Sequence, residues 1–373
     1  MLDLGISLQL FLGTNMPTPA PYTVVDALVE AEIENKDSDF DGFKLTFTLD
    51  KDSLLDYELL LGKKLDPPGR MIIIAIINGL PQVLIDGFIT RQEFVPSNRP
   101  GESRLYVYGK DITMRLDLEE KKEIYPNQSD SLIAAGILTS PAYADLRLIP
   151  QITTTTDVPI EVDRVPTQQG TDLAFLRELA RRNGFVFYIE PTLVPGVNTA
   201  YWGPDNRLGI PQPALTMNMG SETNVDSPIN FSYDALEPEE PQITIVEPLT
   251  KLSIPIPLPG GLRPPLARRP AKPLRKTLPK DTANLNPVQA ALRGLASLSG
   301  SSDAVKAIGE IDSLRYGRAL KSRRLVGVRG VGESYDGNYY VQTVTHRIKR
   351  GEYKQSFTLV REGLGTLVPL VVP

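Results

Sequence analysis

The alternation of apolar and polar residues is clearest near the C-terminus. Tyr353 begins a run in which Tyr353, Phe357 and Leu359 fall on one side of an extended chain and polar residues fall on the other. Two runs before it, Leu325 to Val331 and Tyr339 to Ile348, are rich in β-branched, aromatic or glycine residues. Because a glycine-containing turn signal separates each pair of runs, the pattern predicts three consecutive strands.

The middle run of the three is apolar on both faces. Tyr340, Val344 and Ile348 lie opposite Tyr339 and Val341 in an extended chain. A strand of this kind must be covered on both sides, by its own core and by something else. We expect the second cover to come from another subunit, with Tyr339, Val341, Tyr340 and Ile348 as the interface candidates.

The N-terminal third shows the same strand patterns. After a loose leader, Met1 to Pro21, alternating or continuous apolar runs occur at Tyr22 to Glu34, Phe43 to Asp50, Met71 to Ile77, Val83 to Ile89 and Arg104 to Gly109. We expect a β-barrel or sandwich with one solvated face on several strands. The run from Met71 would be an aggregation hazard if its edge were bare.

A weak internal repeat links the two strand-rich regions. Asp86-Gly87 is followed by a strand, a turn and the run from Leu105 to Asp111, and Asp336-Gly337 is followed in the same way by a strand, a turn and the run from Phe357 to Glu362. Because Asp-Gly turns are common between strands, the match could also arise by chance.

The region between the modules mixes helix and strand. Thr171 is a capping residue for a helix that ends at Asn183-Gly184, with Leu173, Leu176, Leu179 and Ala180 as its buried stripe. Asn127 or Ser129 is positioned to cap a shorter helix. Strands are expected at Phe185 to Ile189, Leu215 to Met219 and Ile229 to Tyr233.

A proline-rich basic segment interrupts the second module. Glu247 to Lys280 holds nine prolines, eight lysines or arginines and one acid, which excludes a helix or an inner strand. We expect an extended strap laid over an acidic partner, with Arg263, Arg268, Arg269 and Arg275 as contact candidates. The segment lacks the interleaved aromatic residues that stack on nucleic-acid bases. Two helices should follow, one opened by Asn286-Pro287 and one capped by Ser302 or Asp303.

Composition and charge exclude several classes of function. The net charge of −5 does not favour nucleic acid or an anionic membrane as the main partner, and the absence of cysteine excludes disulfides and cysteine–metal sites. We expect no signal peptide, because no basic region follows Met1. His346 is the only histidine, so a multi-histidine metal site cannot form and a structural role is favoured.

The remaining motifs point to turns and surface rather than to chemistry. The acids Asp37, Asp39 and Asp41 copy the start of a calcium loop, but Thr48 stands where the bidentate glutamate is needed. Gly330-Val-Gly332 begins like a dinucleotide fingerprint without a helix after it. The adjacent pairs Glu119-Glu120 and Glu239-Glu240 read as solvated surface. We therefore expect no enzyme, no cofactor and no metal.

Two blocks of the sequence resemble the phage late-control D family, which supplies baseplate hubs of contractile tails and the hub half of VgrG-type spikes. The C-terminal block includes Gly317, Leu320, Gly330-Val-Gly332, Asp336-Gly337, Tyr340-Val341, Val344-Thr-His346, Tyr353 and Phe357-Thr-Leu359-Val-Arg361. The other block runs from Gln169 to Tyr188, and Tyr201-Trp202-Gly203-Pro204 follows it. Together they cover most of the chain outside the proline-rich segment, which departs from the family pattern.

The resemblance implies a mainly β, α+β chain with two related tube-like β-barrel domains. The expected domains are residues 1–112 for the first barrel, 113–205 for an α/β domain, 206–246 with 313–373 for the second barrel, and 247–312 for the proline-rich and helical insert. Three chains of the family present six similar barrels in a ring.

The implied function is a structural one. The ring would be a homotrimeric adaptor between a hexameric tail tube and a trimeric spike, with further contacts to baseplate or wedge proteins. Assembly in the bacterial cytoplasm and incorporation into a phage tail or injection particle follow from the same resemblance. Because the sequence printed here has no repetitive β-helix, the spike is expected to be a separate protein. The alternatives are a tail-tip cell-wall hydrolase and a carbohydrate-binding tail protein.

Overall fold

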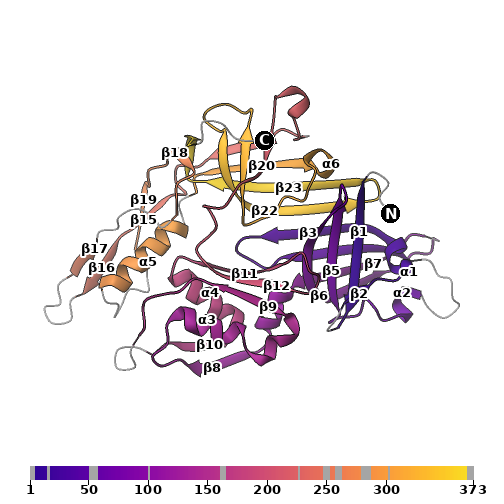
Figure 1. The fold of residues 1–373 in the computed structure, drawn as a ribbon, viewed down its shortest axis with the longest axis horizontal. Coiled ribbons are helices and arrows are strands. Elements are labelled where there is room, and N and C mark those ends of the chain that lie inside the picture. Colours follow the sequence, from indigo (N-terminus) through magenta and orange to yellow (C-terminus); the bar gives the residue numbers. More distant parts are fainter. Residues whose placement is uncertain are drawn as a thin grey trace.

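The computed structural model describes most of the chain and shows a mainly β, α+β fold (Figure 1). The described residues are 5–14, 17–49, 58–99, 101–159, 165–225, 227–246, 253–256, 263–278, 287–300 and 303–367. Strands from both ends of the chain join in one 13-stranded sheet, and a smaller α/β domain lies beside it. The mainly β, α+β class implied by the resemblance, and indicated by the many strand-like runs, is confirmed.

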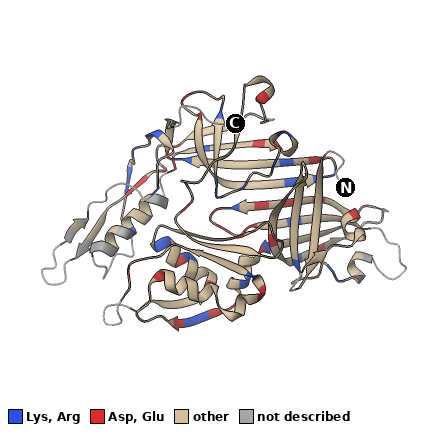
Figure 2. Ribbon diagram, in the orientation of Figure 1, with Lys and Arg blue, Asp and Glu red and all other residues tan. Residues whose placement is uncertain are grey.

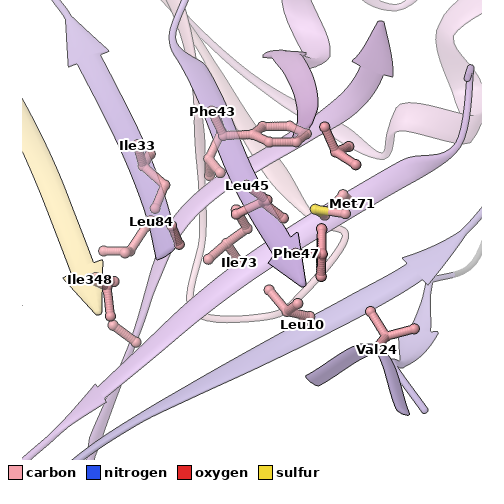
Figure 3. Close-up of a cluster of buried hydrophobic side chains, with 14 of the residues drawn as sticks. Leu10, Val24, Ile33, Phe43, Leu45, Phe47, Met71, Ile73, Leu84 and Ile348 are labelled. Carbon is pink, nitrogen blue, oxygen red and sulfur yellow. The ribbon is translucent and has the colours of Figure 1, made fainter. Parts of the chain in front are cut away.

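The first module is a curved antiparallel sheet around its own core. Its strands are β1 (Ile6–Gly13), β2 (Thr18–Pro19), β3 (Leu28–Lys36), β4 (Gly42–Leu49), β5 (Arg70–Ile77), β6 (Leu80–Val95) and β7 (Ser103–Asp111). They lie in the order β3-β4-β7-β6-β5-β1-β2. Inward-facing residues such as Phe43, Leu45, Phe47 and Ile73 form the core (Figure 3).

Two expectations for the N-terminal region were wrong. The leader was expected to be loose, but it contains β1, which pairs with β5 from Ile6–Ile77 to Gly13–Arg70 and so covers one edge of the run from Met71. Tyr22 begins a short helix, α1 (Tyr22–Ala27), and β3 starts only at Leu28. Six residues are too few to distinguish a helical from an extended apolar pattern, and the buried Val24 fits either one.

The second module is built from both sides of the insert. Its strands are β13 (Gln212–Thr216), β14 (Asn230–Tyr233), β20 (Val305–Asp312), β21 (Leu325–Arg329), β22 (Gly337–Lys349) and β23 (Glu352–Arg361). They form the order β14-β20-β23-β22, with β21 beside β22 and β13 beside β21. A short helix, α6 (Ser313–Tyr316), follows β20. Their shared core includes Val326, Tyr339, Val341, Phe357 and Leu359.

The second helix expected after the insert is instead strand β20. Asp303 precedes the strand without capping a helix, and Ser302 lies outside the described residues. Val305 and Ala307 are buried while Lys306 and Ile308 are exposed, which is the period of two that defines a half-buried strand. Because β20 pairs with β14 and β23, residues 305–312 belong with the second module rather than with the insert.

The two modules have the same strand order. In space the strands of the first module lie in the order β1-β5-β6-β7-β4-β3, and those of the second in the order β13-β21-β22-β23-β20-β14. If the six strands of each module are numbered along the chain, both modules have the spatial order 1-4-5-6-3-2. The short helices α2 (Glu58–Leu61) and α6 also take equivalent places, between the third and fourth strands. The modules differ in the direction of their first strand, because β1 is antiparallel to β5 whereas β13 is parallel to β21.

A bulge occurs at the same point in both central hairpins. The β6–β7 ladder shifts register after Ile89–Gly109, leaving Thr90 extra, and the β22–β23 ladder shifts after Val341–Leu359, leaving Gln342 extra. Superposing the bulges moves the alignment by two residues from the one that the Asp-Gly pairs suggest, and Asp86-Gly87 lies inside β6 rather than in the turn expected from the sequence. The two modules therefore share their topology and the position of the bulge, but their sequences match too little to show the repeat.

The two modules do not form two closed barrels. Strand β3 of the first module pairs with β22 of the second, so their strands belong to a single sheet. The pairings among the described strands form an open path with a side branch rather than a closed circuit. Large antiparallel modules were predicted from alternation, but closure depends on which edges meet, and alternation carries no information on that.

The middle domain packs helices against small sheets. Its elements are η1 (Ile112–Asp117), β8 (Glu120–Ile124), α3 (Asp130–Leu138), η2 (Pro141–Leu146), β9 (Leu148–Ile152), β10 (Thr167–Thr171), α4 (Asp172–Arg182), β11 (Val186–Pro191) and β12 (Asn198–Gly203). Ser129 and Thr171 cap α3 and α4, as predicted for these two helices. The expected stripe of α4 is buried, with Trp202 fully enclosed beside it.

The insert forms an arm of short strands and one helix at the left of Figure 1. Its described elements in this arm are β17 (Ser253–Ile256), β18 (Ala267–Pro270), β19 (Arg275–Thr277) and α5 (Pro287–Gly300), and they are joined by two strands that precede the insert in the chain, β15 (Glu239–Pro241) and β16 (Ile243–Val246). The helix expected to open at Pro287 is confirmed as α5. The strap is not free-standing, because β18 pairs with the C-terminal strand β24 (Gly363–Thr366) and β19 pairs with β15.

Candidate functional site at the joint of the two modules

The apolar side chains of strand β22 are covered by their own chain. Tyr339, Tyr340, Val341 and Ile348 are all buried, each no more than 3% exposed. Their side chains therefore cannot form the subunit contact expected from the sequence. The two apolar faces correctly indicate a second cover, but a local pattern cannot show that distant segments of the same chain supply it.

Each face of β22 has an identifiable cover. Tyr339 and Val341 lie in the core of the second module, while Tyr340 packs with Leu266 of the proline-rich segment. Ile348 projects into the core of the first module, beside Ile33 and Leu84 (Figure 3). One strand thus contributes to both module cores, which makes it the structural link between them.

The joint itself is an antiparallel strand pairing. The distal half of β22 pairs with β3 from Thr343–Lys36 to Lys349–Glu30. Acidic positions of β3 face basic positions of β22 there (Figure 2), and Glu30 Oε1 lies 2.6 Å from Arg347 Nε and 3.6 Å from Lys349 Nζ. These exposed pairs set register more than they add stability.

A buried ion pair fixes the joint from within. Arg323 of the second module donates from Nη2 to Asp41 Oδ1 at 2.7 Å and from Nη1 to Oδ2 at 3.0 Å, and it also bonds the Lys36 carbonyl. Its guanidinium carbon lies 4.6 Å from the ring centroid of Tyr188 in the middle domain. Arg323 therefore contacts both modules and the middle domain, and the carboxylate of Asp41 raises its already high pKa further despite burial.

A second carboxyl group shares this buried site. Asp111 accepts from the Asp41 amide at 3.2 Å and from the Thr113 amide at 3.1 Å. Burial, reinforced by the nearby charge of Asp41, raises the pKa of Asp111 to about 7. A carboxyl group with that pKa could exchange a proton near neutral pH, but every contact it makes is within the protein framework.

His346 has the structural role that the sequence favoured. The side chain is buried on β22, and its Nδ1 lies 3.0 Å from the hydroxyl of Tyr353. Burial lowers the pKa of His346 to about 3, so the ring stays neutral at physiological pH. The cavity beside it, lined by Asn35, Asp41 and Arg323 among others, holds only about 40 Å³ and could not admit a sugar chain.

A second ionic cluster fixes the insert to the rest of the chain. Arg263 Nε lies 2.8 Å from Asp205 Oδ2, and Arg207 lies 2.6 Å from Asp303, so both arginines are engaged inside the chain. Glu362 Oε1 accepts from the backbone amides of Leu266 at 2.5 Å and Ala267 at 2.6 Å. These contacts place Leu266 over Tyr340.

The four candidate strap arginines divide into two groups. Arg263 and Arg275 pair with acids of their own chain, Arg275 with Glu239 at 3.0 Å, so an acidic neighbouring subunit is not needed to explain them. Arg268 and Arg269 lie on β18 with exposed side chains. For these two a partner contact stays a prediction.

The other motifs have local structural explanations. Asp41, the third acid of the apparent calcium loop, forms an ion pair with Arg323, and Glu239 forms one with Arg275. Within the described ranges, no group of three or more histidine, cysteine or acidic residues is arranged to hold a metal. None of the described helices is both long and apolar enough to cross a membrane.

Sequence reasoning missed the buried ion pairs. Arg323 and Asp41 lie 282 positions apart, and each reads locally as a surface residue. Arg70 and Asp86, paired at 2.7 Å with side chains 1% exposed, are a second example. The hydrophobic runs around Arg70 gave the only available signal, since a charge inside an apolar strand needs a buried partner.

The comparisons with known proteins give a consistent result at the level of the fold. A tail protein from Neisseria meningitidis is similar with a TM-score of 0.64 and 13% identity, covering 97% of this chain and 98% of that one. The 43 kDa tail protein of prophage MuSo2 from Shewanella oneidensis has a TM-score of 0.57 and 15% identity, covering 95% and 99%.

A third similar structure comes from a secretion system. The E. coli c3393 protein, described as a component of the type VI secretion system with structural similarity to T4 bacteriophage tail proteins gp27 and gp5, has a TM-score of 0.56 at 14% identity over 93% of this chain and 77% of that one. No protein-family model matches the sequence, and comparison with curated proteins finds no similar sequence. This chain therefore has the fold of these phage tail proteins and of this type VI secretion component, in agreement with its resemblance to the late-control D family.

Proposed function

We propose that this chain is the structural hub of a contractile tail or injection apparatus. Three copies form a ring in which six β modules receive a hexameric tail tube on one side and a trimeric spike on the other. Baseplate or wedge proteins attach at the periphery, and the particle is assembled in the bacterial cytoplasm. The chain carries no catalytic role in this proposal.

The observation that carries the proposal is the duplicated module. Two units with the same strand order stand side by side in one sheet, joined through β3 and β22. A chain with two similar units can present six similar surfaces with three copies, which is what an adaptor between sixfold and threefold partners requires. The similar structures over nearly the whole chain are of phage tail proteins, which agrees with this use.

The proposal is tested on the purified chain by light scattering and electron microscopy. We expect a species of three chains with a ring-shaped projection that caps purified tail tubes. A chain that stays a single subunit up to high concentration and does not bind tubes would contradict the proposal. Release of soluble fragments from purified cell wall would favour a hydrolase instead, and binding to intact polysaccharide would favour a carbohydrate-binding tail protein.

A further inference from the structure

An open groove lies between the insert and the second module. Its volume is about 390 Å³, which is within the range of pockets that bind ligands and far larger than the cavity beside His346. One wall is the end of β14 with Tyr233, and the other is the part of the insert from Arg269 to Leu274. Leu364 of β24 completes the lining. The groove is therefore built from three separate parts of the chain.

Both walls of the groove are held by backbone contacts. On the insert side, β18 pairs with β24, and the Ala271 amide donates to the Glu362 carbonyl at 2.9 Å. On the other side, β14 pairs with β20, and the Asp234 amide donates to the Ala304 carbonyl at 2.8 Å. The groove is therefore formed before any partner binds, which lowers the entropic cost of binding.

The groove exposes apolar side chains. Tyr233 is 44% exposed and Leu274 is 67% exposed, and Pro270 is exposed between the two basic residues of the insert wall. A single exposed apolar residue needs no explanation, because such residues are common on protein surfaces. Several that line one groove indicate a place where the apolar side chain of a partner is buried.

Basic side chains border the same groove. Arg269 and Lys272 are among its lining residues, and Arg268 is the neighbouring exposed residue on β18. None of these three cations forms an ion pair with a residue in the described ranges, in contrast to two other arginines of the insert. Asp234 follows Tyr233 in the chain, but its carboxylate accepts from the Leu236 amide at 2.8 Å. The groove therefore offers positive charge to a partner.

We propose that this groove docks an acidic, extended segment of a separate baseplate protein. An apolar side chain of that segment packs against Tyr233 and Leu274, and its carboxylates bind Arg269 and Lys272. The proposal rests on the hub function and adds the place and the chemistry of one peripheral contact. Charge complementarity selects the partner, because carboxylates supply the charge that the two cations lack. Arg269 can hold a carboxylate through two parallel N–H groups, whereas Lys272 acts as a point charge.

An acidic peptide suits the groove better than nucleic acid does. Single-stranded nucleic acid binds by stacking successive bases on aromatic side chains, and Tyr233 is the only aromatic residue among the described residues of the lining. Pro270, Leu274 and Leu364 instead offer aliphatic surface. Leucine, isoleucine or phenylalanine side chains of a peptide can pack against such a surface.

Binding of defined peptides to the purified full chain tests the docking groove. The probe is a short fluorescent peptide in which glutamate and leucine alternate, and the matched control peptide has glutamine in place of each glutamate. We expect fluorescence anisotropy to show binding of the acidic peptide about tenfold tighter than that of the control peptide. Equal binding of the two peptides would overturn the inference, because the basic border would then contribute nothing.

Charge reversal shows where the peptide binds. Lys272→Glu should weaken binding of the acidic peptide about tenfold, and Arg269→Glu should do the same. Lys122→Glu makes the same change of charge at an exposed position of β8, outside the groove, and should leave the affinity unchanged. An equal loss in Lys122→Glu would mean diffuse attraction and would overturn the inference. Circular dichroism should show each variant folded, since all three side chains are exposed.

The apolar part of the site has its own variant. Leu274→Ser should weaken binding of both the acidic and the glutamine-containing peptide, because it removes the surface on which their leucines pack. The change should leave the salt dependence of acidic-peptide binding as it is in the natural chain, since no charge is lost. Unchanged affinity of Leu274→Ser for both peptides would contradict the anchoring role of this residue.

The remaining outcomes separate this inference from the hub proposal. Trimers that cap tail tubes but do not bind the acidic peptide would refute the docking groove and leave the hub proposal intact. Peptide binding by a chain that stays monomeric would do the reverse. Loss of trimers in Lys272→Glu would show that a second copy occupies the groove. Tighter binding of a single-stranded oligonucleotide than of the acidic peptide would indicate a nucleic-acid site. Either of these last two results overturns the inference.

Discussion

At the residue scale, the joint between the two modules depends on charged side chains that are buried rather than exposed. Arg323 and Asp41 are each about 4% exposed, and Asp111 shares their site. Hydrophobic patterning predicted the strands around these residues but not the residues themselves, because a buried ion pair leaves no periodic trace in a sequence. Such pairs are expensive to break, since removing one partner leaves an uncompensated charge in the interior.

Removal of Arg323 should therefore weaken the whole chain. Arg323→Ala leaves Asp41 unpaired beside Asp111, and we expect a loss of about 3–5 kcal/mol in the free energy of unfolding. Chemical denaturation followed by circular dichroism measures it. Arg347→Ala removes only the exposed pair with Glu30 and serves as the control. A loss for Arg323→Ala no larger than that of the control would refute the role assigned to this ion pair.

The raised pKa of Asp111 predicts a specific pH dependence. Its carboxyl group has an ordinary pKa of 3.8 when unfolded and about 7 when folded, so between these values the folded state binds more protons. This group's contribution to stability is complete below about pH 4 and is lost as pH rises towards 7. Denaturation curves give the free energy of unfolding of the natural chain and of Asp111→Asn. The difference, natural chain minus variant, should fall as pH rises across that window. If this difference in the free energy of unfolding stays constant with pH, then burial does not raise the pKa of Asp111.

At the element scale, long alternating runs were predicted well and short or covered ones were not. Strands β4, β5, β22 and β23 match their predicted runs closely, because each run extends over seven or more residues, with alternation in β4 and β23 and continuous or two-sided apolar character in β5 and β22. The errors fell on β1, which was taken for part of a loose leader, and on α1 and β20, where a few apolar residues suit either period. The insert was correctly expected to be extended, but its attachment through Leu266 to Tyr340 depends on contacts that no local pattern reveals.

The attachment of the insert predicts a second effect on stability. Glu362→Ala removes the acceptor for the Leu266 and Ala267 amides, so Leu266 should lift from Tyr340. Hydrogen bonds to charged groups contribute about 1.5–3 kcal/mol each, and we expect a destabilisation of that order together with faster proteolysis within residues 263–278. Glu239→Ala, which affects the exposed Arg275, is the control. Unchanged cleavage rates would show that Glu362 does not hold the segment.

At the scale of the whole molecule, the sequence predicted two related modules but not how they meet. The resemblance to late-control D proteins and the alternation together led to the mainly β class and to the repeat. The continuous sheet through β3 and β22 was not foreseen, because strand pairing between residues some 300 positions apart is decided by packing and not by local preference. The same gap explains why buried residues of β22 were taken for interface residues.

The seam between β3 and β22 has a mechanical consequence. It uses a nine-residue strand and is fixed by an interior ion pair as well as by exposed ones. Under tension the two modules of one chain should therefore move as a single body and separate only when the interior pair breaks. High salt, which screens surface charge, should weaken the exposed pairs while leaving this seam closed.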